Sequence, residues 1–405
     1  MTRLISPPRT TCRGCDRSTL ELVLDFGPQP LAGGFLAGPE LIASERRFPL
    51  AVHVCSSCGL VQILDPVDPE ILFQDYSFSS STIAPLVEHF RTYGAALRER
   101  FSPRVVVEFG CNDGVLLSPL QEAGVTAIGV DPSQNITELA RGKGLDVVTG
   151  YFDVLTAHAI RGRAGTADIV TGSNAFAHND RPERILAAAA ELLADDGVLA
   201  LEVMYAGDLL ETLQWDTLYH EHLTFYSLTS LGRLLEQHGF GVFDAERIPM
   251  HGGSLRVFAA RDGRPRQPGA DALYAYENEN HLAEASTWHA FADESLRRIA
   301  IVRDVYADLA AAKRRIWGYG AAGKATMWVN VCEMDYLEAV VDASPLRAGK
   351  LMPGTHTPIV FPEEMRRRPP DVCFVTAWNY ADHIRAKEAW FEGMWSTPLP
   401  ALRFF

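Results

Sequence analysis

The chain has 405 residues, of which 47% are hydrophobic and 22% charged, so it is long enough for two or three globular domains. Its formal net charge of −14 argues against nucleic acid or an anionic membrane surface as a partner. The N-terminal segment lacks the apolar region of a signal peptide, and no apolar run reaches the length of a membrane span. We therefore expect a cytoplasmic protein, in which seven reduced cysteines indicate a metal site before they indicate disulfides.

Residues 1–80 are predicted to form a small first domain of short strands and turns around two Cys-x-x-C pairs. The pairs are Cys12 with Cys15 and Cys55 with Cys58. Four thiolates complete the tetrahedral shell of a Zn²⁺ ion and leave no open position for catalysis. The spacing therefore predicts a structural zinc site. Four unrelated buried cysteines are the alternative.

Strands and helices alternate in the second predicted domain, 81–262. The predicted elements are a helix at 83–101, strands at 104–110 and 125–131, a helix at 136–144, strands at 145–150 and 167–173, a helix at 184–197, and strands at 198–206 and 252–261. This alternation is typical of parallel βαβ units and a doubly wound α/β sheet.

The first strand of that sheet leads into a glycine-containing turn, "VEFGCNDG". Gly110 and Gly114 let a ligand approach the backbone, and Asp131 at the end of the next strand can hold the two hydroxyls of a ribose. By its spacing alone the loop also fits an NAD-binding fold or a packing turn.

The stretch "LYHEHLTFYS" at 218–227 follows the fifth strand, close to the edge where a substrate would lie. A histidine can remove a C–H proton at neutral pH, and an adjacent carboxylate or phenol can orient the ring or polarise the substrate. A polar helix cap at the surface is the alternative interpretation.

The third predicted domain, 263–405, begins with a long helical stretch and continues with a second βαβ unit. The glycine loop "GYGAAGKA" at 318–325 joins its first strand to its helix. By spacing alone this loop would bind a dinucleotide, with Asp342 as the acidic residue. An NAD-dependent oxidoreductase is therefore a competing function.

Several further motifs occur in a fixed order. They are "GLVQ" (59–62), "VEFGCNDG", "YHEHLTFYS", "HGGSLRV" (251–257), "GYGAAGKA" and "TAWNY" (376–380), after the two cysteine pairs. Together they resemble the zinc-containing sugar C-methyltransferases of deoxysugar biosynthesis, which depend on S-adenosylmethionine (SAM). Within that family the resemblance is to the dTDP-sugar C-3 methyltransferases of the tetronitrose pathway, and it spans almost the whole chain.

The resemblance implies an α/β fold with three lobes. They are a small N-terminal zinc-binding lobe, a central class I methyltransferase lobe with a doubly wound sheet, and a C-terminal Rossmann-like lobe that binds substrate. The implied substrate is a dTDP-linked 4-keto-deoxysugar, methylated next to its ketone, most naturally at C-3. We expect no nucleic-acid or membrane partner, and a monomer.

The family's catalytic residues carry over onto matching positions of this sequence. His222 becomes the base that removes the proton next to the ketone, and Tyr219 and Glu221 orient that base or polarise the substrate. Tyr76 and His178 match positions that face the substrate and the developing enolate.

Ligand-binding residues carry over in the same way. The predicted SAM site contains Glu108, Gly110, Asn112, Gly114, Asp131, Pro132 and Asn174, and the predicted substrate site contains Gly320, Lys324 and His251. Lys324 and the glycine loop are expected near the diphosphate. Position 220 is His, where the resemblance to the nitrosugar enzymes implies Asp. The C-terminal "STPLPALRFF" also departs from the family pattern. The identity of the sugar is therefore left undetermined.

Two other functions fit part of the pattern. An O- or N-methyltransferase would use the SAM loop and a base for an O–H or N–H proton, but it would need no enolate stabiliser, so the dense His/Glu/Tyr set would be more than it requires. A zinc-ribbon nucleic-acid-binding protein would use the cysteine pairs but disagrees with the net charge of −14.

Overall fold

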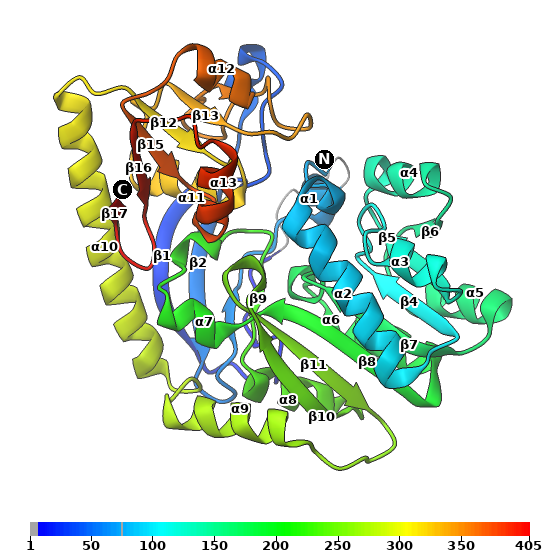
Figure 1. Cartoon of the computed structure of the whole chain (residues 1–405). Coiled ribbons are helices and arrows are strands. Elements are labelled where there is room, and N and C mark those ends of the chain that lie inside the picture. The colour runs from blue at the N-terminus through cyan, green and yellow to red at the C-terminus, as the bar shows by residue number, and fades with distance from the viewer. Residues whose placement is uncertain (1–6, 74–75) are drawn as a thin grey trace.

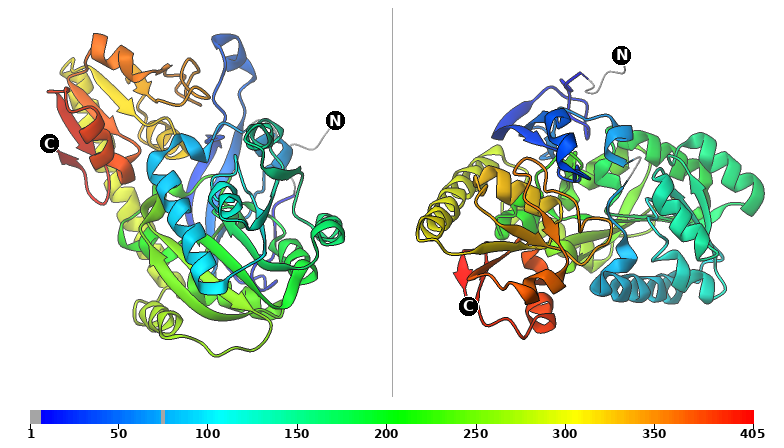
Figure 2. Two further views of the ribbon diagram at one scale, coloured as in Figure 1. Left: turned by 45° about the vertical axis from the view of Figure 1, so that its right-hand side comes forward. Right: turned by 90° about the horizontal axis from the view of Figure 1, so that it is seen from above.

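The computed structural model describes residues 7–73 and 76–405, which form three sheets surrounded by helices (Figure 1). Residues 1–6, part of the segment in which no signal peptide is expected, and residues 74–75 lie outside the described parts. The central and C-terminal lobes lie on opposite sides of the molecule, and the N-terminal sheet lies against both (Figure 2).

The N-terminal sheet is antiparallel and takes its last strand from a distant part of the chain. Its order is β1 (Leu20–Pro30), β2 (Arg47–Cys55), β3 (Val61–Ile63) and β9 (Thr224–Phe225). Helix α1 (Pro69–Phe73) follows this part of the chain. Because β9 comes directly after the predicted catalytic segment, the zinc-binding part of the chain is hydrogen-bonded to that segment.

The central sheet has seven strands. Their order is β10 (Gly241–Ile248), β11 (Ser254–Ala260), β8 (Leu193–Met204), β7 (Ala167–Ser173), β4 (Val105–Phe109), β5 (Thr126–Asp131) and β6 (Asp146–Thr149). Only β11 runs antiparallel to its neighbours. The strand order reverses between β4 and β7, so the ligand-binding crevice of such a sheet lies outside their carboxyl ends.

Helices cover both faces of the central sheet, as the βαβ pattern predicts. They are α2 (Ala84–Phe101), α3 (Leu117–Glu122), α4 (Gln134–Gly142), α5 (Val154–Ala164), α6 (Pro182–Leu192) and α8 (Leu228–Gln237). The short helix α7 (Ala206–Glu211) follows β8 and packs in the core next to the N-terminal sheet (Figure 1). The doubly wound fold is confirmed. The helix predicted for 184–197 ends at Leu192 instead, because the following residues extend β8 and pair Leu193 with Ala167.

The C-terminal lobe is a second, mostly parallel sheet. Its strands are β14 (Ile359–Val360), β13 (Ala339–Val341), β12 (Ile316–Tyr319), β15 (Val372–Val375), β16 (Met394–Thr397) and the antiparallel β17 (Arg403–Phe404). Its helices are α10 (Ala285–Ala311), α11 (Gly323–Val331), α12 (Pro362–Arg367) and α13 (Ala381–Lys387). Helix α9 (Pro268–Glu279) precedes them in the chain but packs on β10 and α8 of the central lobe (Figure 1). The expected Rossmann-like unit is therefore present.

Hydrophobic cores cross the lobe boundaries. Cys12, Cys55 and Cys58 belong to the core beneath the central sheet, and Trp288 of α10 packs in the same core as Val52 of β2. We propose the division 1–80, 81–262 and 263–405 for the three lobes, with β9 as a strand that the second contributes to the first. No helix in the described ranges is long and apolar enough to cross a membrane.

A buried carboxylate joins the central and C-terminal lobes. Asp216, in the short helix η4 (Trp215–Thr217), is fully buried. Its Oδ2 accepts hydrogen bonds from the indole nitrogens of Trp328 (2.9 Å) on α11 and Trp378 (2.7 Å) in η6 (Trp378–Tyr380). A single acceptor on the central lobe thus satisfies one buried and one half-buried indole donor of the C-terminal lobe.

Removal of this acceptor should destabilise the protein. Asp216→Leu leaves the buried indole N–H of Trp328 and the half-buried one of Trp378 without their shared acceptor, and a buried donor in that state costs about 1–3 kcal/mol. Asp216→Asn retains an oxygen that can accept both bonds, so its thermal midpoint should fall less. Calorimetric unfolding measures both, with Asp304→Leu on the exposed face of α10 as the control. Equal losses for the Leu and Asn variants at position 216 would contradict the acceptor role.

Candidate active site

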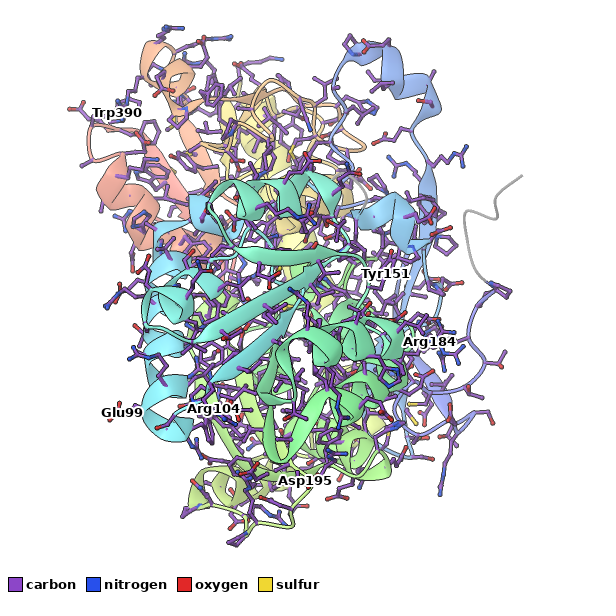
Figure 3. All side chains as sticks on the ribbon, turned by 90° about the vertical axis from the view of Figure 1, so that its right-hand side faces the viewer. Glu99, Arg104, Tyr151, Arg184, Asp195 and Trp390 are labelled. Atoms are coloured by element: carbon purple, nitrogen blue, oxygen red, sulfur yellow. The ribbon has the colours of Figure 1, made fainter. Side chains whose placement is uncertain are left out.

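A cavity of about 960 Å³ lies at the carboxyl ends of the central strands and reaches the glycine loop of the C-terminal lobe. Its wall includes Gly33, Phe35 and Phe73 from the N-terminal lobe, Tyr76, Gly110, Asn112, Asp131, Pro132, Asn174, His178, Tyr219, Glu221, His222 and His251 from the segments around the central sheet, and Gly320, Lys324, Asp342 and Arg347 from the C-terminal lobe. Tyr151 and Arg184, two exposed wall residues, lie on the face shown in Figure 3. The volume is near the upper end for ligand sites, so more than one ligand group can enter.

The glycine loop after β4 forms one wall of this cavity. Gly110 has a φ of +64°, and a Cβ at this position would lie 2.2 Å from the Cβ of Ala175, so glycine is required here. The side chain of Asn112 accepts a hydrogen bond from the N–H of Ser80 (2.9 Å) and donates one to the carbonyl of Phe78 (3.1 Å). Asn112 thereby fixes the segment around 78–80 next to the loop.

Asp131 ends β5 with its carboxylate at the cavity wall. Oδ2 accepts a hydrogen bond from the N–H of Asn112 (3.0 Å), and Oδ1 accepts one from the N–H of Ser133 (2.9 Å). Burial raises the pKa of Asp131, and these bonds oppose the rise. The backbone therefore orients the carboxylate, and each oxygen retains a further lone pair that can accept from a ligand hydroxyl.

The predicted SAM residues differ in how they meet the cavity. Pro132 and Asn174 line it, and Asn174 has a buried Oδ1 for which the described residues supply no donor. An acceptor left without a partner at a ligand-facing edge fits a ligand that donates hydrogen bonds, as the amino group and ribose of SAM do. Glu108 and Gly114 lie behind the wall, where a Cβ on Gly114 would meet Leu145 at 2.1 Å.

His222 has one ring nitrogen fixed and one available. Its Nδ1 lies 2.7 Å from the carbonyl oxygen of Thr217, which can only accept, so Nδ1 carries the proton and Nε2 keeps its lone pair. Burial lowers the pKa of His222 well below its usual value, with a smaller contribution from His178. The ring centroid lies 4.0 Å from that of Tyr219 and 5.2 Å from that of His178. A neutral imidazole in this tautomer can act as a base.

Glu221 lies in the same cavity and contacts the N-terminal lobe. Burial raises its pKa to about 7, and a hydrogen bond from the backbone of Gly33 limits the rise. A Cβ on Gly33 would lie 2.8 Å from Oε1 of Glu221, so this loop can approach only as glycine. The adjacent His220 turns away and places Nε2 3.2 Å from the carbonyl of Phe48. The departure from the family at position 220 is therefore outside the cavity wall.

The aromatic residues around the imidazoles are packed in series. Phe73 stacks on His178 with centroids 5.7 Å apart and also contacts the ring of Tyr76 at 5.7 Å. Burial lowers the pKa of His178 to about 4 and raises those of Tyr76 and Tyr219 well above 10. At neutral pH both phenols therefore keep the proton that a hydrogen-bond donor needs.

The C-terminal glycine loop faces the same space. Gly320 has a φ of +97°. Lys324 donates a hydrogen bond to the carbonyl of His251 (3.3 Å), and its Nζ lies 4.4 Å from the ring centroid of Trp378. Burial lowers the pKa of Lys324. Tyr219 packs against this loop, since a Cβ on Gly323 would lie 2.8 Å from Cζ of Tyr219.

Sequence reasoning missed several wall residues. The sequence offers Asp342 only as the acidic residue of an NAD site, yet it accepts hydrogen bonds from Ala321 and Ser344 (both 2.8 Å), as Asp131 does from its own loop. The repeated pattern "DPS" and "DAS" at the two strand ends is a signal that could have identified it. Arg347 and the loop at Gly33 carry no such signal.

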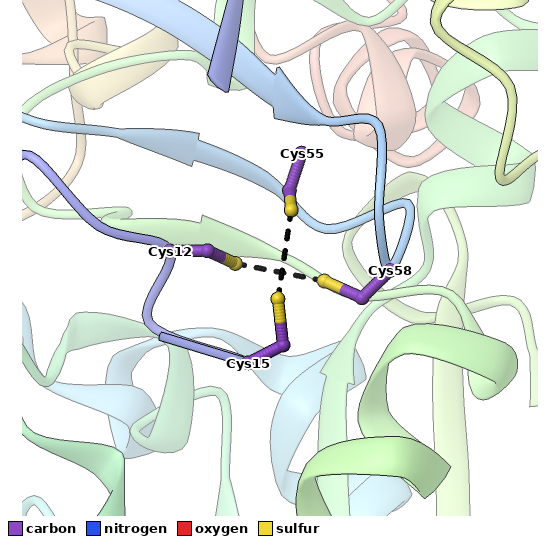
Figure 4. Close-up of side chains that lie close together, drawn as sticks. All are labelled: Cys12, Cys15, Cys55 and Cys58. Atoms are coloured by element: carbon purple, nitrogen blue, oxygen red, sulfur yellow. Dashed lines mark hydrogen bonds between the residues drawn. The ribbon is translucent and has the colours of Figure 1, made fainter. Parts of the chain in front are cut away.

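The four cysteines of the two predicted pairs lie together (Figure 4). Their sulfur atoms are all within 4.8 Å of one another, with Cys12 and Cys58 at 3.5 Å and Cys15 and Cys55 at 3.6 Å. Tetrahedral Zn²⁺ with bonds of about 2.3 Å requires sulfur atoms about 3.8 Å apart, so the donor set fits the ion. Gln62 Nε2 donates to the sulfur of Cys12 (3.1 Å), a bond that favours a thiolate.

Comparison with known families covers most of the chain. Residues 12–73 match a family described as "Putative zinc binding domain", residues 85–244 match "Methyltransferase domain", and residues 249–400 match "C-methyltransferase C-terminal domain". The C-methyltransferase NovU of Streptomyces niveus is 34% identical over 406 residues, which cover 98% of this chain and 97% of that protein.

Solved structures resemble part of the chain more weakly. Magnesium protoporphyrin IX methyltransferase of Synechocystis, with bound SAM, is 18% identical and matches 43% of this chain and 77% of its own, with a TM-score of 0.33. The CcbJ methyltransferase of Streptomyces caelestis is 17% identical and matches 42% of this chain and 89% of its own, with a TM-score of 0.33.

The metal site allows a direct test. Purified protein should contain about one Zn²⁺ per chain, held by the four cysteines. Cys12→Ser should lose that zinc and unfold at a lower temperature, because a structural zinc ion contributes folding free energy. Elemental analysis and thermal unfolding measure both effects, with Cys373→Ser as a control buried far from the cluster. Full zinc content in Cys12→Ser would contradict the assignment.

Proposed function

The chain belongs to the C-methyltransferases that combine a four-cysteine zinc centre with a SAM-binding domain, and we propose that its acceptor is a dTDP-linked 4-keto-deoxysugar. Family membership follows from the relative that matches nearly the full length of both chains. It also follows from the C-methyltransferase C-terminal domain. The sugar nucleotide, the methylated carbon and the roles of individual residues are the proposal.

A single observation carries the proposal. The SAM loop, the Tyr-x-Glu-His segment and the C-terminal glycine loop line the same cavity of about 960 Å³. A small acceptor would need only the first two. A long acceptor that carries a nucleoside diphosphate uses all three, because its charged part can lie at the second loop while its sugar reaches the base.

The SAM end is assigned to the loop after β4. In the proposal Gly110 and Asn112 approach the ligand through the backbone, Asp131 accepts from the ribose hydroxyls, and Asn174 accepts from a polar donor. Pro132 packs beside them. SAM, when bound, supplies an electrophilic methyl group. Glu108 and Gly114 support the loop from behind.

The base is assigned to His222. A carbon next to a ketone becomes nucleophilic only after its proton is removed, and Nε2 of His222 has the free lone pair for this step. Glu221 lines the same cavity, and in the proposal its carboxylate stabilises the positive charge of the resulting imidazolium. Burial of both groups in the cavity strengthens that attraction, because little water is present to screen it.

The enolate oxygen needs hydrogen-bond donors. Tyr76 and Tyr219 are protonated phenols in the cavity wall, and His178 is a neutral imidazole stacked between Phe73 and His222. In the proposal they donate to the oxygen that gains charge, an effect that often dominates catalysis. Such a set serves C–H activation and has no use in O- or N-methylation.

The nucleotide end is assigned to the C-terminal loop. Gly320, the N-terminus of α11 and Lys324 offer backbone N–H groups and a cation for the diphosphate, and His251 holds Lys324 through its carbonyl. Arg347 adds a second buried cation with an unpaired Nε among the described residues. We retain C-3 as the methylated carbon because of the resemblance to C-3 methyltransferases.

The compartment and the oligomeric state complete the proposal. A cytoplasmic location fits four cysteines that must stay reduced to bind zinc. The monomer expected from the sequence stays a prediction.

Isotope labelling tests the reaction. A dTDP-4-keto sugar deuterated at C-3 should lose that deuteron on methylation, and NMR should place the new methyl on C-3. His222→Asn should lower turnover by about 10²–10⁴-fold while SAM affinity, measured by calorimetry, stays near the wild-type value. A retained C-3 deuteron with the new methyl on C-5 would assign the methylation to the other carbon beside the ketone. A retained deuteron with the methyl on oxygen or nitrogen would refute the enolate mechanism.

The pH dependence tests the role of Glu221. Its pKa of about 7 lies above the ordinary carboxyl value, so the charged form needed beside an imidazolium appears only as the pH rises through 7. We expect kcat/KM to increase across this range and Glu221→Gln to abolish the inflection. His222 adds none there, because its pKa is far lower. A rate that falls through pH 7 would instead make protonated Glu221 the active form.

A further inference from the structure

We propose that Arg13, a spacer residue of the first Cys-x-x-C pair, is a positioning residue that sets His178 against His222. The proposal rests on the catalytic roles proposed above for these two imidazoles. It gives the zinc centre a second role, because the centre then stabilises its own lobe and also orients a side chain that holds an active-site loop.

The guanidinium of Arg13 is buried, and each of its three nitrogens donates a hydrogen bond. Its side chain has 0% exposure, and its Nε and NH2 donate to the same oxygen, Oδ1 of Asp180, at 3.1 and 2.9 Å. NH1 donates to the carbonyl of Ile63. A buried guanidinium with all three nitrogens engaged has one orientation available, so Arg13 fixes the position of Asp180.

Asp180 carries this constraint to the first imidazole. It lies two residues after His178, in the turn that follows η3 (Phe176–His178). Its carboxylate is 37% exposed and pairs with Arg13 at its buried side. The carbonyl of Asp180 accepts from Arg9 (2.9 Å), so two arginines of the N-terminal lobe hold both ends of this residue.

The same zinc pair constrains the second imidazole. Gln62 donates from Nε2 to the sulfur of Cys12 (3.1 Å) and accepts on Oε1 from the backbone N–H of Arg13 (3.1 Å). Gln62 is also a residue of β3, where it pairs with Thr224 of β9, two residues after His222. One amide side chain therefore ties the metal site, Arg13 and the strand behind His222 together.

The contacts through Asp180 and those through Gln62 lead to two segments that are hydrogen-bonded to each other next to the imidazoles. The carbonyl of Ala177 accepts a hydrogen bond from the N–H of Leu223 (3.0 Å), so the residues next to His178 and His222 are bonded directly. The imidazole centroids are 5.2 Å apart with planes at 22°. In the proposal this closed set of contacts sets the separation of the two rings. Arg13 joins the zinc pair to the His178 loop through a buried ion pair with Asp180, and the more exposed Arg9 contacts the same carboxylate at 3.6 Å.

Replacement of Arg13 by lysine tests this role. Lysine keeps the charge but cannot donate from three nitrogens in a plane, so the loop should shift while the zinc ligands stay. Arg17→Lys, at an exposed site just after the same cysteine pair, is the matched control. Asp180→Asn weakens the same ion pair from its acceptor side, in the central lobe, and leaves the residues of the zinc pair unchanged.

The main readout is independent of substrate. In protein labelled at histidine Cε1, the NMR signal of His178, assigned through His178→Asn, should move in Arg13→Lys and in Asp180→Asn. The signal of His281, which is 62% exposed and far from the site in sequence, should not move. Zinc content should remain one per chain in every variant, and SAM affinity should stay within about twofold of the wild type, since no SAM residue is moved.

Turnover is the second readout. Misplacement of a reacting group by about 1 Å can reduce rates by about 10²-fold, so Arg13→Lys should lose about 10- to 100-fold in kcat while KM stays near the wild-type value. The double variant Arg13→Lys/Asp180→Asn should lose little more kcat than either single variant, because both substitutions disrupt the same ion pair.

Three results would overturn the proposal. They are an unmoved His178 signal in Arg13→Lys, a moved signal with wild-type kcat, and loss of zinc from Arg13→Lys. A failure of the proposed function would be seen in the isotope-labelling experiment, because the wild-type enzyme would then leave the substrate deuteron in place. The NMR comparison stands in either case.

Discussion

The segment from 215 to 225 contributes no strand to the central sheet, and hydrogen bonds to both outer lobes hold it in place. Asp216 accepts from two tryptophans of the C-terminal lobe. On the other side, the last two residues of the segment form β9 in the N-terminal sheet. The Tyr-x-Glu-His motif lies between these attachments. Its position therefore depends on contacts with all three lobes, whose hydrophobic cores also cross the lobe boundaries.

This constraint also determines the electrostatics of the site. A segment enclosed by three lobes is removed from water, and burial opposes charge on every titratable group in it. His178 and His222 are consequently neutral, the tyrosines keep their protons, and Glu221 titrates near neutrality. The same enclosure that makes His222 a free base makes the imidazolium it would form unfavourable. Glu221 lines the same cavity with a pKa of about 7, so its carboxylate becomes charged in the pH range in which a positive charge on His222 would have to be balanced.

The sequence predicted the fold class and the clustering of the four cysteines, because these depend on short-range patterns, whereas Tyr76 and His178 were placed in the cavity by resemblance to a family. Strand and helix alternation, cysteine spacing and the glycine loops are each encoded within a few dozen residues. The helix expected for 184–197 was too long because pairing with β7 outweighed local preference at 193–197. Gly33, Asp216 and Arg13 were not found, because their importance comes from partners more than a hundred residues away and no local pattern marks such contacts.

The two glycine-loop lobes present matching carboxylates to one cavity. Asp131 is the last residue of β5, and Asp342 directly follows β13. Each carboxylate accepts two backbone N–H groups, one from the glycine loop after the neighbouring strand and one from the residue two positions further on. The two sites line one cavity together with His222, so each loop can receive one ligand. If the acceptor is held at the C-terminal loop, as proposed above, that loop determines how far the acceptor extends toward His222. Under the proposal, the wall around Lys324 and Arg347 therefore decides which carbon is methylated, more than the Tyr-x-Glu-His segment does.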